Sequence, residues 1–264
     1  MSSPVSISAV VDRGRASFRD TQLSPHKFEC DDKLVYVVKP NSNDRQFAND
    51  LLAYAIAKLL GVPVFDAALV FVSDAFLRSS PLLVNRYQVG IHFGSVFPNR
   101  NCFDGYAASP TLIANEVTNT DDFYTLAAFD EIIYNWDRGG NPGNVVFVQS
   151  EPPSRQFAFR AIDHGNAFLG PAWTSNGLAT HIPSPLVPVL AAARDLFRSR
   201  ATLIRRATEV IALTTQFSKT IDEAHSGITV EERAAVTRFV QKRSSELVGW
   251  VSGPIYASKL PSLA

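Results

Sequence analysis

The stretch that most constrains this chain runs over residues 130–168 and reads D-E-I-I-Y-N-W-D-R-G-G-N-P-G-N-V-V-F, a short polar gap, then F-A-F-R-A-I-D-H-G-N-A-F. Two apolar runs in it, residues 145–148 and 157–162, have the length and composition of β-strands. Asn144 precedes the first run and Asp163 follows the second. If the two runs pair as an antiparallel hairpin, Asn144 and Asp163 lie at the same end of it. We therefore expect a polar site at that end.

The residue types at this end suit phosphoryl transfer from a magnesium nucleotide. Mg²⁺ prefers oxygen ligands and usually takes only one or two from the protein, so Asn144 and Asp163 form an adequate pair. Asp137 stands a few residues earlier, where it can orient or deprotonate an acceptor hydroxyl. Kinase catalytic loops share the order Asp, short gap, Asn, apolar strand, hairpin, Asp-x-Gly. We therefore predict ATP and Mg²⁺ as cofactors.

Each motif by itself also fits a plain turn. In N-P-G-N the proline and the glycine suit the two central turn positions, and D-H-G could simply end a strand. The joint occurrence of both motifs in this order favours a site. An EF-hand calcium loop over D-R-G-G-N-P-G is excluded, because Gly139 stands at the third position and Pro142 at the position that requires glycine.

Composition excludes several classes of partner. The chain has 264 residues, enough for one large domain or for two lobes that share a cleft. Its 46% hydrophobic and 19% charged content is that of a globular soluble protein. The 25 basic and 25 acidic residues give a net charge of zero, so we expect neither a nucleic acid nor a membrane as partner.

The chain shows no targeting or transmembrane signal in its sequence. The first twelve residues lack the basic and apolar regions of a secretory signal, and the apolar stretch 51–60 is too short to span a bilayer. Cys30 and Cys102 make neither a disulfide framework nor a metal site. We expect a cytoplasmic protein with reduced cysteines.

The N-terminal part predicts strands followed by a helix. Residues 5–11, 16–18 and 28–39 have strand character, and the last of these ends at Lys39. A helix follows over residues 46–60, with Asp50 on or beside its apolar face.

A buried carboxylate at position 50 requires a partner, and Lys39 is the candidate. In a kinase, Lys39 would hold the nucleotide phosphates and Asp50 would orient Lys39. A solvated Lys39 and a surface Asp50 remain the alternatives.

The remaining chain predicts two further strands and then mostly helices. We expect strands over 62–72 and 82–87, and residues 86–90 leading to the segment that joins two lobes. Asp130 is expected to hold the catalytic loop by hydrogen bonding, and Trp136 to be a packing residue. The expected helices are 121–134, a region within 189–215, and a helix to Trp250 opened by the capping box Thr229-x-x-Glu232. The four arginines Arg198, Arg200, Arg205 and Arg206 are expected on a solvated face.

Residues 131–168 resemble the HipA-like kinases, members of the protein-kinase-like superfamily. The similarity is closest to the stand-alone HipA-like branch, in which N-x-D-R, an Asn-Pro loop and I-D-H-G recur in that order, here at 135–138, 141–144 and 162–165. The resemblance implies a two-lobed α+β kinase fold, with a β-rich N-terminal lobe over 1–87 and a mainly α-helical lobe over 88–264. It also implies ATP-dependent phosphorylation of a hydroxyl, with Ser or Thr of a protein as the expected acceptor.

The sequence departs from the family pattern at two places. The resemblance places a glutamate, paired with the strand lysine, at the second position of Asn49-Asp50, where this chain has the shorter aspartate. No G-x-G-x-x-G loop exists, so residues 12–16 or 21–27 would cover the phosphates, with Ser24 as the candidate contact. The chain is too short for us to expect the extra N-terminal subdomain and DNA-tethered partner of a full-length HipA toxin.

The sequence leaves three other functions open. A pseudokinase would keep the fold as a binding module with or without nucleotide, and the missing glycine loop and Asp50 favour it. A kinase for a small molecule or a lipid is the next alternative, because the acceptor is not encoded in these motifs. A metal-dependent hydrolase that uses Asp137, Asp163 and His164 is the most distant, since the chain lacks a closely spaced histidine pair.

Overall fold

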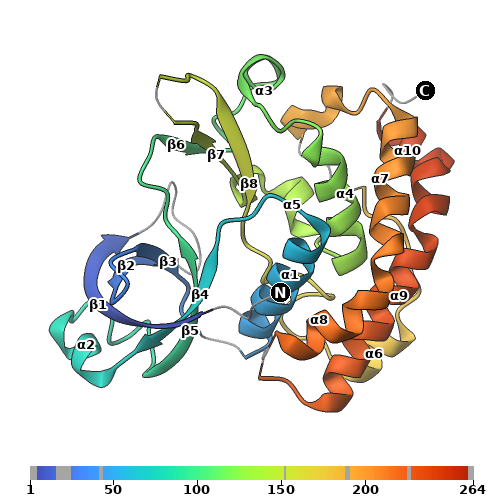
Figure 1. The fold of residues 1–264 in the computed structure, drawn as a ribbon. Coiled ribbons are helices and arrows are strands. Elements are labelled where there is room, and N and C mark those ends of the chain that lie inside the picture. Colours follow the sequence, from blue (N-terminus) through green and yellow to red (C-terminus); the bar gives the residue numbers. More distant parts are fainter. Residues whose placement is uncertain are drawn as a thin grey trace.

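The computed structural model describes residues 5–15, 25–41, 44–151, 153–187, 191–224 and 227–260. The early strands gather into a closed barrel, and the later helices lie on the other side of the molecule (Figure 1). Helix α1 (Asp44–Leu60) lies between these two parts. Two segments that were expected to carry site or strand residues, Ser24 and residues 16–18, lie outside the described residues.

The barrel contains β1 (Val5–Arg15), β2 (His26–Cys30), β3 (Val35–Val38), β4 (Ala67–Val72) and β5 (Gly90–Val96). Its strand order is β1-β2-β3-β5-β4, closed by parallel pairing of β1 with β4. The other neighbouring strands pair antiparallel. Alternate side chains point inward, as the period of two in a strand requires. The barrel core contains the buried side chains of Ile7, Ala9, Phe28, Cys30, Tyr36, Val38, Ala68, Val70, Val72, Phe76, Leu77, Leu83 and Tyr87.

The strand predicted over residues 82–87 is absent, and this prediction was wrong. Backbone N–H groups there donate to carbonyls three and four residues earlier, as in Tyr87 N–H to Leu83 O, so the segment is a series of turns after α2 (Asp74–Ser79). Leu83 and Tyr87 are buried in the barrel, whereas Leu82 and Val84 are exposed. A spacing of four between buried residues is typical of helical turns.

The last strand of the barrel along the chain is β5 instead. It pairs with both β3 and β4. The expectation that residues 86–90 lead out of the barrel was therefore wrong. The connection to the rest of the chain follows β5. Strand β4 begins at Ala67, five residues later than predicted, and Val64 makes only an isolated bridge to Ala161. Pro63 lacks a backbone N–H, which disfavours a regular strand there.

A small sheet and a helical core form the other part of the molecule. The sheet has the order β6-β7-β8 and consists of β6 (Cys102–Asp104), β7 (Val145–Gln149) and β8 (Phe157–Ala161). The helix α4 (Asp122–Ile133) is buried along almost its whole length, because other elements surround it. Its neighbours include α7 (Arg200–Ala212) and α9 (Val230–Ser252). The capping box predicted between Thr229 and Glu232 is present at the start of α9. The remaining helices are α3 (Pro110–Glu116), α5 (Asp137–Gly140), α6 (Ser175–Thr180), α8 (Phe217–Glu223) and α10 (Pro254–Lys259), with short 3-10 turns at Pro142–Asn144, Ala191–Leu196 and Thr214–Gln216.

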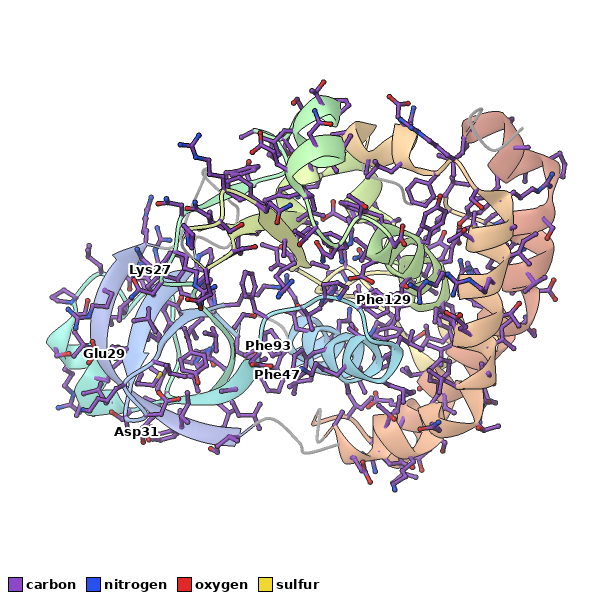
Figure 2. All side chains as sticks on the ribbon, turned by 45° about the horizontal axis from the view of Figure 1, so that its top comes forward. Lys27, Glu29, Asp31, Phe47, Phe93 and Phe129 are labelled. Carbon is purple, nitrogen blue, oxygen red and sulfur yellow. The ribbon has the colours of Figure 1, made fainter. Side chains whose placement is uncertain are left out.

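Helix α1 contacts both parts of the molecule. Its Leu52 and Ile56 belong to the large core of the helical part. On the side toward the barrel, the Tyr54 ring lies 6.1 Å from the Phe93 ring of β5, and Phe47 lies next to Phe93 (Figure 2). A helix buried on most sides holds the side chains near its start at defined positions. No helix in the described part of the chain is long and apolar enough to cross a membrane.

Candidate active site

The antiparallel pairing of β7 with β8 places Asn144 and Asp163 at the same end of the hairpin, as predicted. Val145 lies opposite Ala161 in the register, and Ile162 N–H donates to Asn144 O at 3.0 Å. Asn144 is 4% exposed, whereas the Asp163 side chain is 36% exposed. Asp163 has φ of 57°, a left-handed conformation that Asp tolerates better than most residues. The hairpin thus presents one buried amide and one accessible carboxylate.

Lys39 joins the barrel to this site. Its Nζ lies 2.8 Å from both carboxylate oxygens of Asp50 and 2.9 Å from Asp163 Oδ1. Burial alone would lower the pKa of the Lys39 ammonium, but the two carboxylates outweigh it and raise the pKa above its ordinary value. The same ammonium keeps the pKa of Asp163 below its usual value in spite of burial. Burial raises the pKa of Asp50 in spite of the Lys39 charge, whereas Lys39 and Asp163 are shifted in the direction that favours their charged forms.

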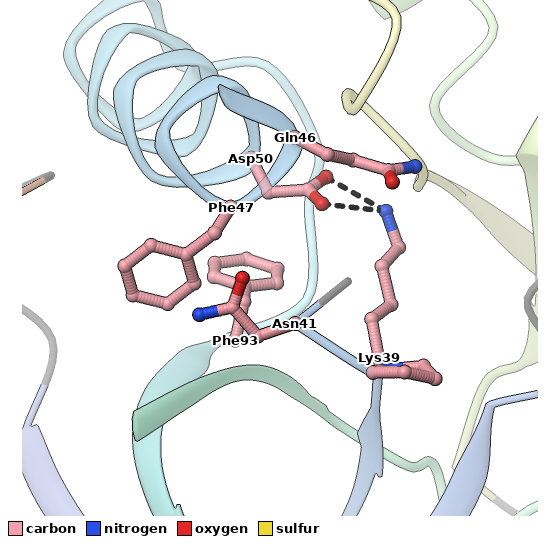
Figure 3. A pocket seen from close by; sticks show the side chains of 7 residues that line it. Lys39, Asn41, Gln46, Phe47, Asp50 and Phe93 are labelled. Carbon is pink, nitrogen blue, oxygen red and sulfur yellow. Dashed lines mark hydrogen bonds and ion pairs between the residues drawn. The ribbon is translucent and has the colours of Figure 1, made fainter. Parts of the chain in front are cut away.

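The aspartate at position 50 reaches Lys39 although it is one methylene shorter than a glutamate. Asp50 is 2% exposed, and its Oδ1 also accepts the His164 backbone N–H at 3.0 Å. Helix α1 packs close enough to the barrel for this contact, with Phe47 and Phe93 between them (Figure 3). The predicted Lys39–Asp50 pair is present, so the alternatives of a solvated lysine and a surface aspartate are wrong.

Asp137 and Asn144 form the second pair of the site. Asn144 Nδ2–H donates to Asp137 Oδ2 at 2.8 Å, which fixes the orientation of the amide. Asn144 Oδ1 is then the atom that can accept from, or coordinate, a further group. Asp137 begins the short helix α5, and the preceding Trp136 is 53% exposed. The interpretation of Trp136 as a packing residue was wrong.

Arg138 is the residue of this site whose role the sequence did not reveal. It is fully buried, and its Nε–H donates to Asp130 Oδ2 at 2.6 Å. Its Nη1 donates to the backbone carbonyls of Asn144 and Ile162, at 2.5 and 2.9 Å. One guanidinium thus joins helix α4, the start of β7 and the end of β8. Asp130 holds the loop after helix α4 by hydrogen bonding, as predicted, and Arg138 is the link.

The Arg138 guanidinium also determines the state of His164. Arg138 Nη2 lies 3.0 Å from His164 Nδ1, which therefore accepts, so the proton resides on Nε2. Burial, and then the charge of Arg138, lowers the pKa of His164 well below its ordinary value. A neutral imidazole engaged in this way does not suit the hydrolase alternative, in which His164 would act on a metal or a water.

The donor atoms of the site fit a cation that takes most of its ligands from phosphate and water. No group of three or more His, Cys, Asp or Glu side chains in the described ranges could hold a metal ion alone. Asn144 and Asp163 supply two oxygen donors at one end of the hairpin, which is the usual protein share for Mg²⁺ on a nucleotide. A small pocket next to Lys39 and Asp50 is lined by these two residues and by Pro40, Asn41, Gln46, Phe47 and Phe93 (Figure 3).

Comparisons with known proteins agree with this geometry. A family model described as HipA-like kinase matches residues 11–245. The structure of the proinflammatory kinase CtkA of Helicobacter pylori is similar, with a TM-score of 0.63 at 11% identity, covering 94% of this chain and 97% of that chain. This likeness shows a kinase-like α+β fold.

Two weaker likenesses were also found. A Golgi casein kinase with Mn/ADP bound has a TM-score of 0.48 at 12% identity, covering 94% of this chain and 73% of that chain. HipA of Shewanella oneidensis MR-1, in a complex with HipB and operator DNA, has a TM-score of 0.45 at 13% identity, covering 91% and 67%. No curated protein sequence matches the chain. The family match over most of its length, together with the kinase-like fold, shows that the chain belongs to the HipA-like kinase family.

Proposed function

We propose that this protein is an ATP- and Mg²⁺-dependent kinase that transfers the γ-phosphoryl group to a hydroxyl, with Ser or Thr of a protein as acceptor. The observation that carries the proposal is the convergence of Lys39, Asp50 and Asp163, with Asp137 and Asn144 paired at the same end of the hairpin. Phosphoryl transfer depends mainly on positioning and on neutralising phosphate charge. These residue types serve both needs.

Each residue has a distinct part in the proposed reaction. Lys39 donates to phosphate oxygens, while Asp50 keeps the ammonium in place and charged. Asp163 and Asn144 Oδ1 are the ligands for Mg²⁺, which when bound would neutralise charge on the β- and γ-phosphates. Asp137 orients the acceptor hydroxyl and accepts its proton. Arg138 touches neither phosphate nor acceptor and holds the loop that carries Asp137 and Asn144.

The division into two lobes stays part of the proposal. The sequence predicted a nucleotide-binding lobe over residues 1–87 and a catalytic lobe over 88–264. The pairing of β5 with β3 and β4 favours a boundary just after Val96 instead. A cytoplasmic location, and the absence of nucleic acid or membrane partners, also remain predictions.

A pseudokinase is the competing function, and one observation favours it. The sequence has a single glycine before Gly61, namely Gly14 in strand β1. A glycine-rich loop that could cover the phosphates is therefore missing. Asp50 no longer counts toward this alternative, because its pair with Lys39 is formed. Nucleotide binding without transfer would distinguish a pseudokinase from a kinase.

The proposal is tested by thermal unfolding of the wild type and of Asp163→Ala, each with ATP alone and with ATP plus Mg²⁺. A ligand that binds only the folded state raises the midpoint according to its concentration over its dissociation constant. We expect a magnesium-dependent rise in the wild type that is lost in Asp163→Ala, and transfer of label from ATP to protein. No rise in the wild type at millimolar nucleotide would refute the kinase and leave a binding module. A rise without transfer would support the pseudokinase.

A further inference from the structure

The side chain of Asn49 makes four hydrogen bonds inside the protein. It is 0% exposed on helix α1, next to Asp50. Its Nδ2 lies 2.8 Å from Gly165 O, 2.9 Å from Ala167 O and 3.2 Å from Gly170 O. Its Oδ1 accepts from Trp173 Nε1–H at 2.7 Å. One buried amide thus binds the chain at four points in the ten residues that follow Asp163.

The backbone after Asp163 needs such a partner. Phe168, Leu169 and Gly170 all have positive φ, at 55°, 74° and 93°. A chain bent in this way cannot satisfy its carbonyls by regular secondary structure, and buried carbonyls without partners are costly. An asparagine side chain offers two N–H donors and one acceptor, all of which are engaged here. The shape of the segment therefore depends on Asn49.

Asp50 and Asn49 both bond the backbone that directly follows Asp163. Asp50 Oδ1 accepts the backbone N–H of His164, the residue after Asp163. Asn49 Nδ2 donates to the carbonyl of Gly165, one residue further. Neither contact involves the Asp163 carboxylate, but together they set the direction of the backbone from which it extends. Two consecutive residues of α1 thus contact Lys39, the proposed phosphate-binding lysine, and the backbone next to Asp163, the proposed metal ligand.

We propose that Asn49 is a positioning residue that sets the orientation of the Asp163 carboxylate, so that binding of the nucleotide-bound divalent cation depends on helix α1. The inference rests on the proposed function and names a residue to which no role has been given. Asn49 itself touches neither nucleotide nor metal. It acts through the backbone of residues 164–170.

Two further contacts of α1 support the same coupling. Gln46 lies against Gly165 so closely that a Cβ at that glycine would be 2.7 Å from Gln46 Cγ. Arg45 lies with its guanidinium 4.3 Å from the centre of the Trp173 ring and forms an ion pair with Glu232 of α9. The first two turns of α1 therefore contact the segment 164–173 near its start, at Gly165, and at its end, at Trp173.

The test compares Asn49→Leu with the matched control Asn119→Leu. Leucine has the branched shape of asparagine and the same number of side-chain heavy atoms, but it is bulkier and leaves the partner groups without hydrogen bonds. Asn119 is also bonded to backbone, with Nδ2 3.2 Å from Phe159 O and Oδ1 accepting Phe159 N–H at 2.9 Å. It makes no contact with Lys39, Asp50 or Asp163. Both variants should have a lower thermal midpoint without ligand, because each leaves backbone groups without their partners.

The deciding measurement is the Mg²⁺ concentration that gives half of the magnesium-dependent rise in thermal midpoint at saturating ADP. We expect this concentration to increase at least tenfold in Asn49→Leu and to stay within twofold of the wild type in Asn119→Leu. The midpoint rise with ADP alone should survive in both variants. A purely structural role for Asn49 would lower the midpoint without changing this concentration.

A second variant keeps the proposal testable if Asn49→Leu does not fold. Trp173→Phe removes the N–H that Asn49 Oδ1 accepts, together with part of the buried ring system, but keeps a ring under Arg45. It should shift the Mg²⁺ concentration about threefold in the same direction. An unchanged Mg²⁺ concentration in every folded variant, with a normal response of the wild type, would overturn the role of Asn49 alone. A wild type that does not respond to ADP and Mg²⁺ would overturn the proposed function, and the role of Asn49 with it.

Discussion

The Lys39 ammonium lies 2.8 Å from both carboxylate oxygens of Asp50, a contact that joins the barrel strand β3 to helix α1. Asp163 Oδ1, from the far end of the β7–β8 hairpin, lies 2.9 Å from the same nitrogen. Three separate parts of the fold therefore meet at one cation. Each of the two carboxylates is close to the other and depends on Lys39 for compensation of its charge.

Lys39→Met should destabilise the protein by about 3 kcal/mol at pH 7, because it leaves the buried Asp50 carboxylate without its cationic partner. Adding Asp50→Asn to Lys39→Met should restore a large part of that loss, since only the partly exposed Asp163 carboxylate then lacks its cation. Urea unfolding of the wild type, both single variants and the double variant gives the coupling free energy. A cost below about 0.5 kcal/mol for Lys39→Met, as expected for exposed ion pairs, would contradict the burial of this pair.

Asp137→Asn should reduce phosphoryl transfer by about 10²- to 10⁴-fold, the usual contribution of a general base, and leave nucleotide binding unchanged. The amide keeps an oxygen that can accept from Asn144 Nδ2, so the loop should keep its shape. Transfer from labelled ATP gives the rate, and the thermal shift with ATP and Mg²⁺ gives binding. Asp66→Asn, at an 80% exposed carboxylate, is the control. Full activity of Asp137→Asn would remove Asp137 from the proposed chemistry.

Arg138→Lys should cost about 3 kcal/mol or more, although the charge is kept. A lysine ammonium is a point donor and cannot reach Asp130, two backbone carbonyls and His164 at once, as the planar guanidinium does. Arg160→Lys is the control, because the Arg160 guanidinium bonds only the carbonyl of the preceding residue, Phe159. Urea unfolding should show a change within about 0.5 kcal/mol for the control. Equal effects of the two changes would refute the special role of Arg138.

Gly165→Ala should destabilise the protein by about 1–3 kcal/mol, because the new methyl group would overlap the side chain of Gln46. The Gly165 backbone does not have positive φ, so steric contact is the sole cause. In a Gln46→Ala background the same change should cost less than half as much. Gly140→Ala, at a position with no atom within 4 Å of the added Cβ, is the control. An unchanged cost in the Gln46→Ala background would show that another contact is responsible.

His92 should make the stability of the fold depend on pH below about 6.5. Its Nδ1 accepts from Asn41 N–H at 3.0 Å and its Nε2–H donates to Gln88 O at 2.8 Å, so the neutral ring suits both partners. Burial lowers the pKa of His92 below its ordinary value of 6.5.

The unfolded chain therefore binds the His92 proton more tightly than the folded protein does. The contribution of the neutral ring is complete above pH 6.5 and is lost as the pH falls toward the folded pKa. Glutamine has a similar donor and acceptor but does not titrate. The stability difference between wild type and His92→Gln, measured by urea unfolding, should shift toward the variant as the pH falls from 7.5 to 5. A pH-independent difference would contradict the prediction.

The sequence by itself determined the parts of the site that depend on short stretches of chain. The β7–β8 hairpin and the common end for Asn144 and Asp163 followed from two apolar runs and the turn between them. Helix α1 and the capping box of Thr229 and Glu232 followed from periodicity and local side-chain chemistry. In each case the interacting residues lie within about twenty positions, so the pattern of residue types encodes the structure.

Only the tertiary structure decided what lies next to what across longer distances. Asn49 and Gly165 are 116 residues apart, and Lys39 and Asp163 are 124 apart. Nothing in a local pattern specifies that a buried amide will meet three carbonyls of a distant bend, or that Leu82 will be exposed while Leu83 enters the barrel. Such contacts arise because burial requires every polar group to find a partner among whatever segments the packing brings near. The roles of Arg138 and Asn49 became visible for that reason only when the chain was seen folded.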